Sequence, residues 1–146
     1  MVKTLAFLQN PWFRPGTSQR LIDKYRDDTD IHRRILAMSA TGRALVKAFG
    51  VKLYREIVWD NANPNHGVTR RAKLSPDPYY MAMRIVTYRP DVILLFGRQA
   101  QDGFNTLFPD KDPHDCTVLR GAHPMAMGSA VEHLKTISEV VQALYR

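Results

Sequence analysis

The chain has 146 residues, 45% of them hydrophobic and 24% charged, which is typical of a globular domain with its own core. No apolar run approaches the ~20 residues that span a bilayer. A single cysteine, Cys116, excludes an internal disulfide and a metal site built from paired thiolates. The net charge is +7, and residues 31–90 hold 11 Lys and Arg against 3 Asp and Glu. This surplus favours a surface that binds a polyanion, with a solvated basic face as the alternative.

In the first half of the chain, the pattern begins with an apolar strand over residues 4–9. A short helix is expected after Thr17 or Ser18, either of which is a suitable N-cap. The segment 31–49 predicts one helix that ends at Gly50 as its C-cap. Its apolar residues at helical spacing are Ile31, Ile35, Met38, Leu45 and Phe49.

A second, short strand is expected over residues 55–62, followed by a loop over 63–76 that is rich in Pro, Gly and Arg. A helix then begins with Asp77 as N-cap and Pro78 at its first position, where the missing N–H costs nothing. The clearest strand is 91–97, because an unbroken apolar run is expected where helices cover both faces of a sheet.

A helix over 98–107 and a fourth strand over 116–122 continue the alternation. Ser129 and Glu132 match a capping box, and the helix that they open is expected to turn one face to the core: Val131, Leu134, Ile137, Val141 and Leu144. The alternation predicts a single α/β domain, a three-layer α/β/α sandwich with a four-stranded, mostly parallel central sheet. Residues 92–96 should form a central, buried strand.

The carboxyl ends of the four strands carry polar side chains. In open parallel sheets, ligands bind outside these ends, so polar groups there are expected to converge on one edge. The residues concerned are Gln9 to Trp12 after the first strand, Asp60 to Asn63 after the second, Gly97 and Arg98 after the third, and His123 and Pro124 after the fourth. Together they predict a pocket that hydrogen-bonds a small planar molecule.

Four segments, LQNPWFRPG, IVWDNA, RPDVILLFGRQAQ and VLRGAHP, resemble in order and spacing the core motifs of the uracil-DNA glycosylase superfamily. The resemblance covers roughly residues 4–144. It implies a DNA glycosylase that hydrolyses the N-glycosidic bond of a flipped-out uracil-like or modified pyrimidine base, with no metal or organic cofactor. The expected partner is single- or double-stranded DNA. No secretion signal is recognisable, so we expect a cytoplasmic monomer that does not bind membranes.

The resemblance implies two catalytic residues, His123 and Asn10. Breaking the glycosidic bond places negative charge on the departing base, and a hydrogen bond from a neutral His123 imidazole would stabilise it. Asn10 would hold the attacking water on the other side of the sugar. Some branches of the superfamily have an acidic residue at this position and others have Asn, which cannot accept a proton. The alternatives are a histidine satisfied by a backbone carbonyl and a simple turn at Asn10.

The expected base-binding residues follow the first two strands: Gln9, Trp12, Phe13, Asp60, Asn61 and Asn63. Asn61 resembles the superfamily's base-reading residue, since a carboxamide offers both an acceptor and donors to a uracil-like edge. Its two polar neighbours in the set are the alternatives for this role. Trp12 or Phe13 would stack on the flipped base.

The expected DNA-binding residues are Arg70, Arg71, Lys73, Arg98, Met125 and Met127. The loop cations would bind phosphates. The superfamily has Ser and a bulky wedge residue after its His-Pro motif, whereas Met125 follows Pro124 here, so Met125 or Met127 is expected to act as the apolar wedge. Two other functions stay open. One is a non-catalytic nucleic-acid-binding relative, and the other is a hydrolase or transferase of small nucleosides, which would leave the basic surplus unexplained.

Overall fold

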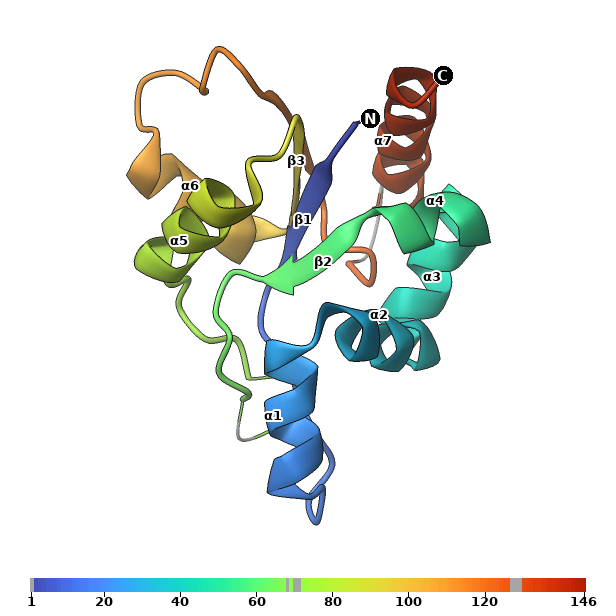
Figure 1. Ribbon diagram of the computed structural model, residues 1–146, viewed down its shortest axis with the longest axis vertical. Helices are drawn as coiled ribbons and strands as arrows, with labels where there is room; N and C mark the ends of the chain where they lie inside the picture. Colours follow the sequence, from blue (N-terminus) through green and yellow to red (C-terminus); the bar gives the residue numbers. More distant parts are fainter. Residues whose placement is uncertain (1, 68, 70–71, 127–129) are drawn as a thin grey trace.

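The computed structural model describes residues 2–67, 69, 72–126 and 130–146. Within these residues, every strand is followed by at least one helix, and four helices separate β1 from β2 (Figure 1). In chain order the elements are β1 (Thr4–Leu8), α1 (Gln19–Asp27), α2 (Thr29–Met38), α3 (Ala40–Phe49), α4 (Val51–Glu56), β2 (Val58–Asn61), α5 (Pro78–Tyr88), β3 (Val92–Phe96), α6 (Arg98–Leu107), β4 (Thr117–Gly121) and α7 (Ala130–Leu144).

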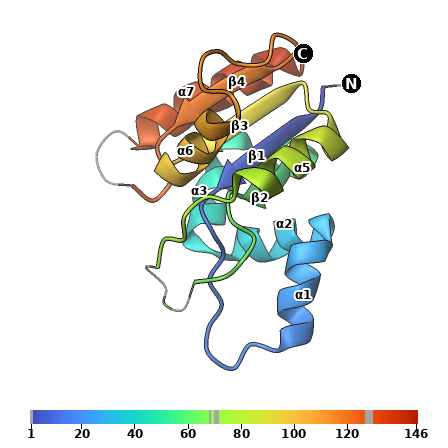
Figure 2. The ribbon, with the colours of Figure 1, turned by 90° about the vertical axis from the view of Figure 1, so that its left-hand side faces the viewer.

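The four strands of the described chain form one sheet in the order β2-β1-β3-β4, and every pair of neighbours is parallel (Figure 2). β3 lies between β1 and β4, and its residues from Val92 to Phe96 are at most 2% exposed. The prediction that residues 92–96 form a central, buried strand is therefore confirmed. The sheet is wholly parallel, where the sequence predicted a mostly parallel one.

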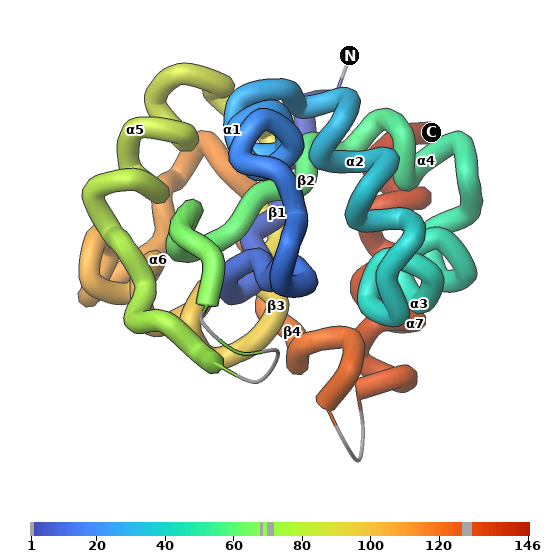
Figure 3. Tube along the Cα trace, turned by 90° about the horizontal axis from the view of Figure 1, so that it is seen from below, coloured from blue at the N-terminus to red at the C-terminus, as the bar shows by residue number. Residues whose placement is uncertain are grey.

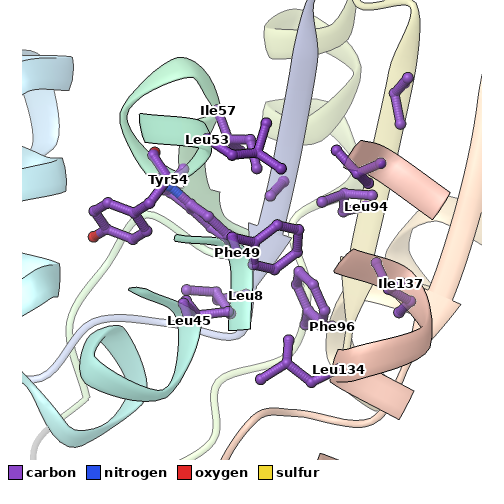
Figure 4. Packing of buried hydrophobic residues seen from close by; sticks show 14 of the residues in the cluster. Leu8, Leu45, Phe49, Leu53, Tyr54, Ile57, Leu94, Phe96, Leu134 and Ile137 are labelled. Atoms are coloured by element: carbon purple, nitrogen blue, oxygen red, sulfur yellow. The ribbon is translucent and has the colours of Figure 1, made fainter. Parts of the chain in front are cut away.

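Helices cover both faces of the sheet, which confirms the three-layer α/β/α sandwich (Figure 1). Side chains of β1 and β3 alternate between the two faces, as the pleat of a strand requires. Leu8, Leu94 and Phe96 pack against α3, α4 and α7 in the cluster that Figure 4 shows. Phe7 and Leu95 face the other way and pack against α5 and α6.

The single helix predicted over residues 31–49 is wrong, because α2 ends at Met38 and α3 begins at Ala40. Ser39 causes the break. Its hydroxyl group donates a hydrogen bond to the carbonyl of Leu36 at 2.6 Å and accepts one from the N–H of Gly42 at 3.0 Å. One side chain thus satisfies the end of α2 and the start of α3. Met38, predicted to be in the core, is 76% exposed because the chain turns there.

The strand predicted over 55–62 begins later than expected. Gly50, with φ of +81°, ends α3 as predicted, but a further helical turn, α4, follows it and runs to Glu56 before β2 starts at Val58. In α7, Leu134, Ile137 and Val141 are buried as predicted, whereas Val131 is 76% exposed and Leu144 is at the surface. Val131 and Leu144, in the first and last turns of that helix, therefore lie outside the core, although Ala130 in the first turn is buried.

Several other predictions about the elements are confirmed. Ser18 caps α1 by accepting a hydrogen bond from the N–H of Leu21, and Asp77 caps α5 with Pro78 at its first position. The capping box cannot be compared with the structure, because Ser129 lies outside the described residues. In the part of the chain that is described, no helix combines the length and the apolar character needed to cross a membrane.

The α2–α3 corner gives the first testable prediction. A Cβ at position 42 would overlap the main-chain carbonyl of Leu36, so Gly42→Ala must push the two helices apart. We expect a loss of about 2 kcal/mol in the free energy of unfolding, the scale of overpacking, measured by urea denaturation. Lys47→Ala on the exposed side of α3 is the control and should change it by less than ~0.5 kcal/mol. Equal stability of the two variants would contradict the described corner.

Candidate functional site

The candidate site is the edge of the sheet at which the parallel strands end. The connections that follow β1, β2 and β4 all lie at this end of the molecule (Figure 3). The main chain also links the first two of these connections, since the N–H groups of Ala62 and Asn63 donate to the carbonyls of Leu8 and Gln9 at 2.8 and 3.0 Å. The convergence of strand ends is thus as expected from the sequence.

Asn10 ties the β1–α1 connection to the β2–α5 connection. Its Nδ2 donates hydrogen bonds to the carbonyls of Ala72, at 3.1 Å, and Pro11, at 3.3 Å. Its Oδ1 accepts the N–H of Leu74 at 2.8 Å. Both amide donors are therefore used, while a carboxamide oxygen still offers a second lone pair. A water molecule can meet this side chain only as a donor to Oδ1.

Asn63 has a similar structural role within the β2–α5 connection. Its Nδ2 donates to the carbonyl of Ser75 at 2.9 Å, and its Oδ1 accepts the N–H of Asn65 at 2.9 Å. The side chain thus fixes the long loop at both of its ends. These bonds occupy the amide edge that a base would otherwise pair with, so Asn63 stabilises the loop in this structure.

Asp60 is held in a buried ion pair. Its side chain is 8% exposed, its Oδ2 lies 2.5 Å from Nε of Arg84, and its Oδ1 accepts the hydroxyl group of Tyr80 at 2.7 Å. Its Oδ1 also accepts the N–H of Asn61 at 2.8 Å. Two side chains of α5 thus satisfy a carboxylate at the end of β2, which anchors that helix to the sheet.

Asn61 is 4% exposed and lies beside the hydroxyl group of Tyr25, the buried side chain of α1. Burial raises the pKa of Tyr25, and the Asn61 amide beside its hydroxyl group opposes that rise. The Tyr25 ring stacks on the imidazole of His32, with centroids 4.1 Å apart. Burial lowers the pKa of His32, and the charge of Asp60 opposes this effect. A ligand that pairs with the Asn61 amide would therefore have to replace its contact with Tyr25.

Phe13 extends the group of rings formed by Tyr25 and His32. Its ring meets the ring of Tyr25 edge-on, with centroids 5.2 Å apart, and the ring of His66 at 5.7 Å. It thereby connects the β1–α1 connection, α1 and the β2–α5 connection. Trp12 and Gln9 are half-buried at the same edge. Of the two aromatic residues predicted to stack on a base, Phe13 is the one whose ring contacts Tyr25, the neighbour of Asn61.

His123 follows β4 and begins a tight turn, closed by a hydrogen bond from the N–H of Ala126 to its carbonyl at 2.8 Å. Its Nδ1 accepts the N–H of Met125 at 3.1 Å. A neutral imidazole with an accepting Nδ1 carries its proton on Nε2. Burial lowers the pKa of His123, and the charge of Lys73 lowers it further. At neutral pH the ring is thus an uncharged donor through Nε2.

Gly97 supports His123 from the end of β3. Its φ of +94° favours glycine, and a Cβ there would lie 3.2 Å from the Cβ of His123. Its N–H also donates to the carbonyl of Gly121 at 2.8 Å, next to the turn. The third and fourth strand ends are thus in direct contact, as the sequence analysis expected for one shared edge.

The expected DNA-binding residues are partly visible. Lys73 and Met125 are exposed, and the Arg98 side chain is 88% exposed at the start of α6, with Nε 3.7 Å from Asp102. Arg70, Arg71 and Met127 lie outside the described residues. Among the residues that are described, no group of three or more His, Cys, Asp or Glu side chains is arranged to hold a metal ion.

Four residues at this edge were not predicted from the sequence: Tyr25, His32, Tyr80 and Arg84. One signal was available for Tyr25, because it is the aromatic residue of an otherwise highly polar helix, QRLIDKYRD, and a lone aromatic there points to a buried contact. The partners of Asp60 carried no comparable signal, since Arg84 is 24 residues away.

No protein-family model matches this sequence, and no curated protein matches it either. A functional proposal therefore rests on the chemistry of this edge and on the four motifs of the sequence.

The ion pair of Asp60 gives the second prediction. Arg84→Met removes the cation from a buried carboxylate, so we expect the free energy of unfolding to fall by about 2–4 kcal/mol, measured by urea denaturation. Arg34→Met breaks the exposed pair with Asp30 and should cost less than ~1 kcal/mol. If both variants lose the same small amount, Asp60 does not depend on Arg84 and is available to a ligand.

Proposed function

We propose that this protein is a DNA glycosylase that hydrolyses the N-glycosidic bond of a flipped-out uracil-like or modified pyrimidine base. The observation that carries the proposal is the His123 turn, in which Nδ1 is occupied by a main-chain N–H and a neutral ring presents Nε2–H. It follows β4 at the edge where the parallel strands end, and the other two residues that the motif resemblance pairs with it lie at the ends of β1 and β2: Asn10 and Asn61.

His123 acts on the leaving base in this proposal. As the glycosidic bond breaks, negative charge gathers on the oxygen atoms of the base. A preorganised N–H donor stabilises such an anion more than it stabilises the neutral base, so it lowers the barrier. A neutral ring is the suitable state, because the donor needs no proton transfer to act. The lowered pKa of His123 supports this assignment.

Asn10 acts on the attacking water. The free lone pair of Oδ1 accepts a hydrogen bond from the water, while the other polar groups of the amide hold the loop. An amide is not a base, so the water attacks without prior loss of a proton. The glycosidic bond breaks with its electron pair on the base, the water oxygen bonds to the sugar carbon, and the proton that this oxygen then loses passes to the departing base anion or to solvent. The reaction then depends on positive charge that has already developed on the sugar, and a slow enzyme is expected.

Asn61 reads the base edge, with Phe13 as the stacking ring, once Tyr25 has been displaced. Asp60 and Asn63 are less suited to this role, because their polar atoms are engaged by α5 and by the loop. Met125, 54% exposed in the His123 turn, is the proposed wedge that enters the stack as the nucleotide leaves it. The proposal retains Met127 as the alternative wedge.

The remaining expectations belong to the same proposal. Lys73, Arg98, Arg70 and Arg71 bind DNA phosphates, and no metal or organic cofactor takes part. The protein works as a monomer in the cytoplasm.

Removing His123 tests the proposal directly. His123→Ala should lower single-turnover base excision by about 10²–10³-fold, the effect of losing one oxyanion donor. DNA affinity should stay close to that of the wild type, because the phosphate contacts set it. The assay is abasic-site cleavage on a panel of duplexes and single strands that carry uracil or modified pyrimidines. His114→Ala, an exposed histidine in the α6–β4 connection, is the matched control and should cut normally.

The outcomes separate the possible functions. Equal cleavage by the wild type and His123→Ala would show that His123 has only a structural role in the turn. DNA binding without cleavage of any substrate would indicate a non-catalytic relative. Release of bases from free nucleosides, without DNA binding, would indicate a small-molecule hydrolase.

The proposed DNA path predicts a salt effect. Each phosphate contact adds about 0.9 to the slope of log affinity against log salt concentration. Neutralising Arg70, Arg71 and Lys73 together should flatten that slope, as measured by fluorescence anisotropy over a salt series. A second triple variant of Lys47, Lys52 and Arg55, exposed cations on α3 and α4, is the control for lost net charge. A slope that changes only in this control would place the DNA on the other side of the molecule.

A further inference from the structure

One buried side chain holds α1 in the molecule. All nine residues of this helix are described, and Tyr25, at 7% exposed, is the buried one among them. The helix projects away from the sheet, and α2 follows it in the chain (Figures 1 and 2). An element with so few buried contacts lies at the low end of local stability, so it opens at a smaller cost than the strands of the core.

The ring of Tyr25 occupies a slot whose walls come from three other segments. On one face it lies nearly parallel to the imidazole of His32, with centroids 4.1 Å apart and 20° between the planes. The ring of Phe13 stands across it, with centroids 5.2 Å apart and 89° between the planes. The Asn61 amide lies beside its hydroxyl group. A parallel ring, a crossed ring and a carboxamide at the polar end are contacts that a planar heterocycle also uses.

His32 is the unusual part of this slot. It is 5% exposed, and its Nε2 has no hydrogen-bond partner among the residues that the structure describes. Buried polar atoms are nearly always paired, and an unpaired one is typical of a place with a functional role or a further occupant. The stack on Tyr25, and not a hydrogen bond of Nε2, therefore orients the imidazole. Burial lowers the pKa of His32, so its face is uncharged at neutral pH.

We propose that Tyr25 closes, in the free protein, a slot for a planar ring with a polar edge, and that His32 is the residue on whose face an incoming ring stacks. That this ring is a base of DNA rests on the proposed function, whereas the slot does not depend on it. His32 then provides a second stacking surface beside Phe13, and Tyr25 determines specificity because a ligand must replace it.

The resident ring also indicates the size of the ligand. The phenol of Tyr25 is one six-membered ring with one polar substituent, and a pyrimidine has a similar outline with polar atoms at its edge. A purine adds a second, fused ring, and walls that fit one ring accommodate it only by moving. The slot therefore favours pyrimidines over purines.

A simple anchor for α1 is the competing role for Tyr25. In that role its loss would leave an apolar void that takes a flat ring and a saturated ring equally, or none at all. The proposed role makes a different prediction, because stacking on His32 and pairing with Asn61 both require a planar ring with polar atoms.

The test removes the resident ring and offers small rings in its place. Phenol, uracil and cyclohexanol are added to the free, full-length Tyr25→Ala protein, and the NMR signals of the His32 imidazole are followed. Phenol and uracil, at millimolar concentration, should shift these signals, because a ring then lies over the imidazole, and cyclohexanol should not. Tyr79→Ala, which removes a tyrosine that is 84% exposed on α5, is the matched control and should respond to none of them.

Two further variants make the test specific. Tyr25→Phe keeps the ring in the slot, so none of the three compounds should bind. The double variant Tyr25→Ala/His32→Ala should bind phenol about tenfold more weakly than Tyr25→Ala, the loss of one stacking contact, as measured on the phenol signals. If Tyr25→Ala does not fold alone, phenol should restore the folded protein and cyclohexanol should not, because a ligand of the folded state stabilises it.

A binding measurement connects the slot to DNA. Without the resident ring, no fraction of the protein is closed, so Tyr25→Ala should bind uracil-containing DNA several-fold more tightly than the wild type and unmodified DNA equally well. His32→Ala should weaken binding to the uracil-containing DNA alone, and His114→Ala is its control.

The possible failures are distinguishable. No effect of phenol on Tyr25→Ala, folded or during refolding, would overturn the slot, and equal effects of phenol and cyclohexanol would reduce it to an apolar void. Unchanged phenol binding in the double variant would overturn the role of His32. Binding of phenol and uracil to Tyr25→Ala, with no base released by the wild type from any DNA, would support the slot and would overturn the proposed function instead.

Discussion

Burial of β1 and β3 on both faces is the constraint on which the rest of the structure depends. A strand in the middle of a parallel sheet has its main-chain groups paired on both sides and its side chains covered above and below. Polar side chains can therefore be placed only beyond the ends of such a strand. In a parallel sheet these ends lie at one edge, so the sheet itself brings Asn10, Asn61 and the Gly97–His123 contact to that edge.

The polar side chains at this edge meet two demands. The long connections leave unpaired main-chain groups, and Asn10 and Asn63 satisfy several of them at the cost of their own freedom to bind a ligand. Asp60 likewise uses its carboxylate to hold α5. His123 differs from these residues, because its local hydrogen bond uses only Nδ1 and determines which nitrogen carries the proton. Among the candidate catalytic and base-binding residues, His123 is the one whose local hydrogen bond leaves an N–H donor, on Nε2.

The sequence predicted what depends on local order. The apolar run 92–96, the Asp77 cap and the Gly50 stop are each decided by a few adjacent residues, and the structure has them. The helix break at Ser39 escaped prediction because apolar spacing continues through it, and a serine hydroxyl group can also sit harmlessly on a helix surface.

The contact partners of the polar side chains at this edge could not be predicted from the sequence, for a different reason. Two of the partners of Asn10, Ala72 and Leu74, are more than 60 residues away, and Tyr25 reaches Asn61 from helix α1. Residue type and position after a strand indicate which side chains gather at the edge. They do not indicate which of these side chains other segments already occupy, because that depends on the path of the long loops.

The position of Tyr25 adds a step to the proposed reaction. A base that pairs with Asn61 would have to displace the Tyr25 side chain beside it, and with it the stack on His32 and the contact with Phe13. Aromatic pairs contribute about 0.5–1.5 kcal/mol each, and the apparent affinity for a base falls with the fraction of molecules that are open. A planar base that stacks on Phe13 and pairs with Asn61 recovers this cost, whereas a group without a ring cannot. In the proposed reaction, the protein's own tyrosine would thus compete with the base, and selectivity would arise from the contacts that the incoming base must replace.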